Sequence, residues 1–362
     1  MKIAIFHTSM DNIGGSEIVT LILARELKAD IYTTNIDMEK IKKMGFDDVK
    51  LVSIGKISFN NDHFRKQIIS WFFKRLNLKD KYDFFIISGE WAVSAAMNNR
   101  PNLYYMHTPI RELWDMYKEI RKKIMPSRRL LFDIWVLYNR FLNKKYIKHV
   151  EKIICNSENT RQRLKTFLHH DAKVVNPPIY TDKFHYEKNG NYWLSVNRLV
   201  KDKQVEIQIE AFKKLSKEKL IIVGCFEETK YLNTYIRYLQ KIKPNNVEIL
   251  HWVDFDKLTK LYANCKGFIA TANDEDFGMS VVEAMASGKP VIAGNEGGYK
   301  ETVIDGKTGI LIDNIDSNKL AEAIKKIGKN PEKFKKECLK RAKKFDTSEF
   351  IKKIKQEIKN GK

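Results

Sequence analysis

Two glutamates stand eight positions apart in the stretch EDFGMSVVEAMASGKPVIA, residues 275–293. The strand-like run GFIATA precedes it, so we expect Glu275 in the loop after a strand and Glu283 about one turn into a helix that begins near Met279. Gly278 permits a tight turn and lets the next backbone amides approach a phosphate or a hydroxyl. Glu283 can accept two hydroxyl hydrogen bonds, as an acidic residue does with a ribose. The two carboxylates would then hold the two ends of one ligand.

Short β-branched runs alternate with amphipathic stretches of helical length along the whole chain. This alternation is typical of parallel sheets covered by helices, so we predict an α/β fold class. Strands are expected at 2–7, 30–34, 83–88, 102–107 and 152–157, and then at 192–197, 219–224, 247–252, 267–272, 290–294 and 309–313.

The chain has 362 residues, 43% of them hydrophobic, which is enough for two cores of ordinary size. Pro177 and Pro178 disfavour regular structure and end the first series of strands. We therefore place the domains at 1–176 and 179–345, with a terminal helix at 346–362 that either completes the second domain or crosses back to the first.

Composition limits the functional classes. The formal net charge is +21, and a surplus of this size attracts nucleic acid, anionic lipid or phosphorylated small molecules. A nucleic-acid-binding protein is the less favoured alternative, because no helix-turn-helix, zinc finger or RNA-binding strand motif is recognisable. The four cysteines are scattered and predict neither a disulfide nor a metal cluster. Without a membrane-spanning run or a leader peptide, we expect a cytoplasmic protein.

Several candidate site residues follow expected strands, where ligands of doubly wound sheets bind. Gly14 and Gly15 permit close backbone approach, and Ser16 can cap a helix whose amides favour an anion. A tight turn alone would explain this segment equally well. His107, Arg111 and Asp115 are expected close together at the start of a helix, although a lone histidine is more often structural.

Two cations follow the expected strand at 192–197. Arg198 offers a planar fork and Lys203 a mobile point charge, which together suit a diphosphate. The alternative is solvated charge, which is common in so basic a chain.

The stretch 275–293 resembles the E-x7-E motif of the group 1 family of retaining glycosyltransferases. Further segments similar to that family follow its order: GGSE, HTPIR, NRLVKDKQ and EGGYKETVIDGKTGILI, which begin at residues 14, 107, 197 and 296. The resemblance covers essentially the whole chain. It implies the GT-B architecture, in which two Rossmann-like, doubly wound parallel-sheet domains face across a cleft, and a final helix that crosses back to the first domain.

The resemblance also implies residue roles. The position matching Glu283 holds the nucleotide ribose, and the position matching His107 lies beside the transferring sugar. Arg111 and Asp115 are expected near the sugar or the acceptor. The donor-binding residues implied are Gly14, Gly15, Arg198, Lys203, Glu275, Phe277, Gly278, Met279 and Glu283. The residues implied in catalysis are His107, Glu275, Arg198 and Lys203.

The expected chemistry requires no cofactor and no metal ion. A glycosyl donor loses a nucleoside diphosphate, and Arg198, Lys203 and helix amides can stabilise the charge that develops on it. The acidic runs at 254–256 and 274–276 resemble D-x-D metal sites, but we interpret the first as a helix cap and the second as part of the glutamate loop. The family implies same-face attack assisted by the leaving diphosphate, so Glu275 would position the sugar.

The acceptor is expected in the first domain. Residues 63–76 and 117–152 interleave Lys and Arg with large apolar side chains, which is the composition of helices on an anionic membrane surface. The alternative is ordinary helices with a solvated basic face. A peripheral enzyme on the cytoplasmic membrane face would use a glycan or lipid-linked glycan acceptor. The segment HTPIRELWDMY resembles mannosyltransferases of surface polysaccharide and lipid-linked glycan synthesis, which favours GDP-mannose as the nucleotide sugar. A sugar-nucleotide epimerase or a glycogen-type glucan synthase would keep the same donor site.

Overall fold

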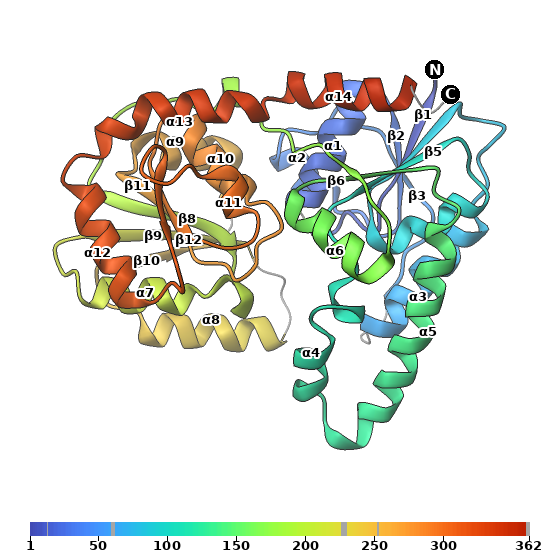
Figure 1. The fold of residues 1–362 in the computed structure, drawn as a ribbon, viewed down its shortest axis with the longest axis horizontal. Helices are drawn as coiled ribbons and strands as arrows, with labels where there is room; N and C mark the ends of the chain where they lie inside the picture. Colours follow the sequence, from blue (N-terminus) through green and yellow to red (C-terminus); the bar gives the residue numbers. More distant parts are fainter. Residues whose placement is uncertain (13, 59–61, 226–229, 252, 360–362) are drawn as a thin grey trace. The chain divides into compact units, whose positions relative to one another are not determined.

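The computed structural model of the protein describes residues 1–12, 14–58, 62–225, 230–251 and 253–359. The chain divides into two compact units. The first unit contains Met1–Asn176 and the C-terminal residues from Ile351 onward, and the second contains Pro177–Phe350. The division falls at the Pro177–Pro178 pair. Each unit is a parallel sheet covered by helices, which confirms the α/β class (Figure 1).

The first unit contains a seven-stranded parallel sheet in the order β3-β2-β1-β4-β5-β6-β7. Its strands are β1 (Ile3–Phe6), β2 (Asp30–Thr33), β3 (Leu51–Ser53), β4 (Phe84–Ile87), β5 (Asn102–Met106), β6 (Lys152–Cys155) and β7 (Lys173–Val174). Its helices are α1 (Gly15–Leu27), α2 (Met38–Lys43), α3 (Asp62–Arg75), α4 (Tyr117–Lys123), α5 (Arg129–Ile147) and α6 (Glu158–Leu168), with 3-10 turns η1 (Glu90–Met97), η2 (Arg111–Leu113) and η3 (Pro126–Arg128). The five expected strands are present. The short strands β3 and β7 were not predicted, because three and two residues carry no readable periodicity.

The second unit contains a six-stranded parallel sheet in the order β10-β9-β8-β11-β12-β13. Its strands are β8 (Tyr192–Arg198), β9 (Lys219–Cys225), β10 (Val247–Leu250), β11 (Gly267–Ala270), β12 (Val291–Gly294) and β13 (Gly309–Ile312). Its helices are α7 (Val205–Lys213), α8 (Lys230–Ile242), α9 (Phe255–Asn264), α10 (Met279–Ala286), α11 (Tyr299–Thr302), α12 (Ser317–Gly328) and α13 (Lys335–Ala342), with 3-10 turns η4 (Thr181–Lys183), η5 (Lys201–Lys203), η6 (Pro331–Phe334) and η7 (Lys343–Phe345). All six expected strands of this half are confirmed.

The last helix, α14 (Thr347–Lys359), begins in the second unit and continues into the first. Ile354 and Ile358 are buried. Glu357 forms ion pairs with Lys152 at 3.0 Å and Lys173 at 2.7 Å, both on strands of the first unit. Residues 360–362 of the expected terminal helix lie outside the described residues.

Two smaller expectations have clear outcomes. Asp254 is the N-cap of α9, where its side chain accepts a hydrogen bond from the amide of Lys257 at 2.7 Å, as expected of a helix cap. Cys155, Cys265 and Cys338 are buried and free, as expected of small core residues.

Candidate functional site

The strand order of each sheet reverses at one point. In the second unit the reversal lies between β8 and β11, which are paired neighbours. Loops on the two sides of such a reversal diverge and leave a crevice at the carboxyl ends of the strands. The loop after β8 carries Lys203, and the loop after β11 carries Glu275. The fold thus brings two separately predicted segments to the place where α/β sheets bind ligands.

Lys203 and Glu275 are in direct contact. The Lys203 ammonium lies 2.5 Å from Oε2 of Glu275, and both side chains remain partly exposed. Two bonds also tie the loops together: Thr271 donates its hydroxyl to the carbonyl of Lys203 at 2.8 Å, and the amide of Asn273 donates to the carbonyl of Asp202 at 2.9 Å. These hydrogen bonds therefore fix the two loops relative to each other at the ion pair.

Glycines make this packing possible. Gly278 precedes α10 with φ +87°, a left-handed conformation, and an added Cβ would lie 2.7 Å from the Tyr299 ring. Gly297 has φ +54°, and a Cβ there would lie 2.5 Å from the carbonyl oxygen of Glu275. The amide of Gly298 donates to that same carbonyl at 2.7 Å. The segment EGGY, residues 296–299, thus packs directly against the backbone of the Glu275 loop.

Glu283 lies on α10, in the second turn, as predicted. The Tyr262 hydroxyl donates to its Oε2 at 2.7 Å, and Tyr262 itself is fully buried. Burial raises the pKa of Glu283, and the hydrogen bond from Tyr262 offsets part of that effect. Tyr262 therefore fixes the direction of the carboxylate.

The remaining predicted donor residues differ in exposure. Arg198 is the last residue of β8 and its side chain is exposed. Met279 is partly buried at the start of α10. Phe277 is buried and packs edge-on against Phe345 with ring centroids 5.4 Å apart. The Phe277 side chain therefore belongs to the core, and only its backbone can face a ligand.

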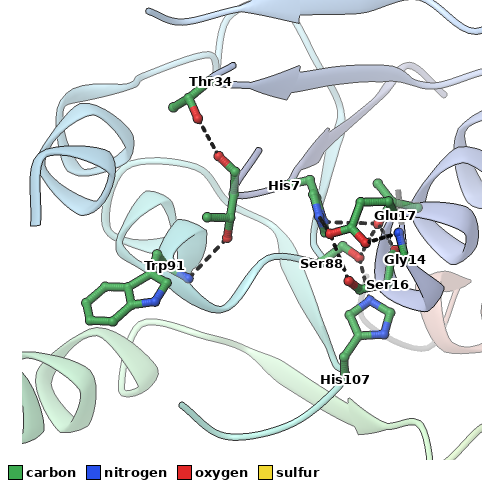
Figure 2. Close-up of polar contacts among 10 residues, drawn as sticks. His7, Gly14, Ser16, Glu17, Thr34, Ser88, Trp91 and His107 are labelled. Carbon is green, nitrogen blue, oxygen red and sulfur yellow. Dashed lines mark hydrogen bonds and ion pairs between the residues drawn. The ribbon is translucent and has the colours of Figure 1, made fainter. Parts of the chain in front are cut away.

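In the first unit the strand order reverses between β1 and β4. His7, Ser88 and His107 are the first residues after β1, β4 and β5, which are consecutive neighbours in the sheet. His107 is buried, and its Nε2 lies 2.9 Å from the hydroxyl of Ser88 (Figure 2). Burial, together with the charge of nearby His7, lowers the pKa of His107 to about 3, so the ring is neutral.

His7 connects this edge of the sheet to α1. Its Nε2 lies 3.0 Å from Oε1 of Glu17, and the other carboxylate oxygen accepts the amide of Gly14 at 2.8 Å (Figure 2). Burial raises the pKa of Glu17, but the hydrogen bond and charge of His7 and the backbone amides outweigh it and bring the pKa to about 2. Glu17 is therefore ionised at neutral pH.

The expectation that Ser16 caps α1 is wrong. Gly14 is the N-cap, and α1 begins at Gly15. The Ser16 hydroxyl instead donates to Glu17 at 3.0 Å. The reason is that the helix begins earlier than expected, so Ser16 lies inside it, and Glu17, three residues beyond the cap, accepts a hydrogen bond from the Gly14 amide.

Arg111 and Asp115 are close together, as predicted. Nε of Arg111 donates to Asp115 at 2.8 Å, and Arg163 on α6 lies 3.7 Å from the same carboxylate. The expectation that an α-helix begins here is wrong, because Arg111 begins a three-residue 3-10 turn that precedes α4. Arg163 also donates to Thr108 at 3.3 Å, which links this cluster to the residue after His107.

Several of these residues were missed in the sequence. Glu17 was detectable, because G-x-x-E has capping-box spacing, and His7 and Ser88 were detectable as polar residues at strand ends. Tyr262 and Tyr299 gave no signal, because they reach the site from other elements. Over the described residues, no cluster of three or more His, Cys, Asp or Glu side chains has metal-binding geometry. No helix in the described ranges is long and apolar enough to span a bilayer.

Comparison with known proteins identifies the class. Residues 179–345 match the family described as Glycosyl transferases group 1, and residues 13–183 match Glycosyltransferase Family 4. The chain belongs to the group 1 glycosyltransferases, and its fold is GT-B, with two Rossmann-like domains.

Individual relatives agree with this class. The chain is 31% identical over 205 residues to an uncharacterized glycosyltransferase of Methanocaldococcus jannaschii, a match that spans 55% of this chain and 57% of that protein. It is 26% identical to the alpha-1,3/1,6-mannosyltransferase ALG2 of Dictyostelium discoideum, over 91% of this chain and 90% of the relative. HepE of Anabaena, solved with UDP and glucose, superposes with a TM-score of 0.78 at 17% identity, over 99% of both chains.

Proposed function

We propose that this enzyme is a retaining hexosyltransferase that moves mannose from GDP-mannose to a glycan or a lipid-linked glycan. The observation that carries the proposal is the contact between Lys203 and Glu275 beside the strand reversal of the second unit, with Glu283 on α10, the helix that follows the Glu275 loop. Mannose is favoured because mannosyltransferase relatives match nearly the whole chain.

The described side chains support a separate role for each site residue. Glu283, oriented by Tyr262, would accept the ribose hydroxyls. Lys203 and exposed Arg198 would stabilise the diphosphate as it leaves, without a divalent cation. Glu275 would hold the sugar, and its contact with Lys203 orients it before the donor binds. His107 is proposed beside the transferring sugar.

Thermal-shift screening with UDP, GDP and ADP sugars tests the donor, because a ligand that binds only the folded state raises the melting temperature. We expect the largest rise with GDP-mannose. Product analysis with a lipid-linked glycan acceptor then tests transfer, and the anomeric configuration of the product tests retention. An inverted product would contradict the retaining mechanism. Turnover of the donor to another sugar nucleotide without acceptor would support the epimerase instead.

We further propose that the enzyme binds its acceptor at an anionic membrane surface, and that the outer face of α5 contacts this surface. The inner face of this helix is buried by residues such as Phe132, Val136 and Tyr146. Figure 1 shows α4 and α5 as a hairpin that projects from the sheet of the first unit. Six large apolar residues on α5 are between 53% and 70% exposed: Leu130, Leu131, Ile134, Leu137, Tyr138 and Phe141. At about 100° per residue these six share one face of the helix, opposite the buried one.

The charges around this stripe favour an anionic lipid surface over a second copy of so basic a chain. Exposed cations lie beyond both of its ends: Lys118, Lys122, Lys123 and Arg128 before it, and Lys144, Lys145 and Lys148 after it. Asp133, the acid of this helix, is bonded to Arg121 and Tyr117 of α4. An apolar stripe between basic clusters matches the boundary between acyl chains and anionic headgroups.

A further inference from the structure

A chain of hydrogen bonds in the first unit joins α1 to His107. The Thr20 hydroxyl on α1 lies 2.8 Å from the carbonyl oxygen of Ser16, 3.1 Å from Nδ1 of His7 and 2.6 Å from the hydroxyl of Ser88. Ser88 in turn lies 2.9 Å from Nε2 of His107. Thr20, Ser88 and His107 are all buried.

The positions of the protons follow from the partners that can only accept. A carbonyl oxygen cannot donate, so the single proton of Thr20 is directed to Ser16. The short contact between Thr20 and Ser88 then requires the proton of Ser88, and Ser88 can only accept at its contact with His107. His107 must therefore donate from Nε2.

The same count applies to His7. Ionised Glu17 only accepts, so Nε2 of His7 carries a proton. Nδ1 of His7 lies 3.1 Å from the Thr20 hydroxyl, so Glu17 and Thr20 together fix the orientation of the His7 ring.

We propose that Glu17, His7, Thr20 and Ser88 hold His107 as the neutral tautomer protonated on Nε2. Nδ1 is then the ring atom that accepts a hydrogen bond from a substrate hydroxyl. The four residues are positioning residues that act through His107. The role toward substrate rests on the proposed glycosyl transfer, but the tautomer is a property of the free protein.

Nitrogen-15 NMR of the free protein, labelled at histidine, reads the tautomer directly. The wild-type spectrum should show His107 protonated on Nε2. In Thr20→Val, Ser88 loses its acceptor and donates to His107, so a population protonated on Nδ1 should appear. Ser88→Ala, which removes the acceptor of the Nε2 proton, should also give mixed tautomers and serves if the first variant folds poorly.

Thr33→Val is a matched control. It removes a buried hydroxyl of the same sheet, one that has no hydrogen-bond partner among the described residues. This control should leave the His107 signals unchanged. A wild-type His107 protonated on Nδ1, or signals unchanged in both Thr20→Val and Ser88→Ala, would overturn the proposal.

Kinetics separate this proposal from the proposed function. If transfer occurs, Thr20→Val should lower kcat roughly tenfold or more, because a ring protonated on Nδ1 can no longer accept the hydrogen bond that orients the substrate. The affinity for free nucleoside diphosphate should stay constant. A wild-type kcat in a variant whose tautomer has shifted would overturn the role of Nδ1. Absence of transfer with every sugar nucleotide, beside a confirmed tautomer, would contradict the proposed function alone.

Discussion

The Lys203 ammonium and the Glu275 carboxylate meet at 2.5 Å, although 72 residues separate them in the chain. Lys203 is thus paired with Glu275 in the free enzyme. A diphosphate that binds here has to compete for Lys203, whereas the Glu283 carboxylate is held by Tyr262 and is independent of that exchange.

The two glutamates should therefore respond differently to substitution. Glu283→Ala should weaken binding of free nucleoside diphosphate about tenfold or more, because removing hydrogen bonds to a carboxylate costs about 1.5–3 kcal/mol. Glu275→Ala should leave that affinity unchanged or tighter, since it releases Lys203, and should lower kcat by impairing sugar orientation. Calorimetry with the diphosphate and kinetics with the donor measure the two effects. The opposite pattern would reverse the placement of the ligand.

Transfer should survive chelation of divalent cations. Lys203 and Arg198 supply positive charge beside the proposed diphosphate, so the leaving group can be stabilised by the protein. Initial rates with and without EDTA measure this. Loss of activity that magnesium or manganese restores would show that these cations are insufficient.

Gly278→Ala should destabilise the protein, because it forces a side chain into a left-handed conformation at φ +87° and against the Tyr299 ring. We expect a loss of about 1–3 kcal/mol in the free energy of unfolding. Gly45→Ala is the matched control: its φ is +76°, but an added Cβ meets nothing within 4 Å. Chemical denaturation should therefore show a smaller loss for Gly45→Ala, about 1 kcal/mol. Equal losses would show that contact with Tyr299 contributes nothing.

His107 should make the protein less stable in acid. Its pKa falls from 6.5 in the unfolded chain to about 3 in the fold, so the unfolded state takes up a proton first. This contribution to stability is full above the unfolded pKa and is lost as pH falls from 6.5 toward 3, with a slope of up to about 1.4 kcal/mol per pH unit. His107→Gln should flatten the decline in unfolding free energy between about pH 7 and about pH 5. Parallel curves for the two proteins would contradict the assigned pKa.

Association with lipid should depend on α5. The protein should float with vesicles that contain phosphatidylglycerol and hardly with pure phosphatidylcholine, and added salt should weaken binding through screening. Leu131→Ser combined with Leu137→Ser should reduce flotation, because both lie on the exposed stripe. Met38→Ser is the control, an exposed apolar side chain on α2. Equal recovery with both lipids, or a dimer in solution that the double variant dissociates, would contradict the membrane proposal.

Two neighbouring aromatic residues of α3 differ in their surroundings. Both Trp71 and Phe72 belong to the stretch 63–76, whose composition predicts a membrane-facing helix. Trp71 is exposed, but Phe72 packs against the core of the first unit and beside Gly55. Replacing Phe72 would therefore test stability as well as lipid binding.

The sequence by itself determined the α/β class, eleven strand positions and the two loops that carry Lys203 and Glu275. Strand periodicity, Gly278 and the proline pair are local signals that need no knowledge of the rest of the chain. The tertiary structure alone decided which distant residues meet: Glu275 with Lys203, Glu283 with Tyr262, and His107 with Ser88. It also decided that Phe72 and Phe277 face the core while Leu131 does not. Sheet order and helix packing fix these outcomes, because a side chain's partners and burial depend on elements far away in the sequence.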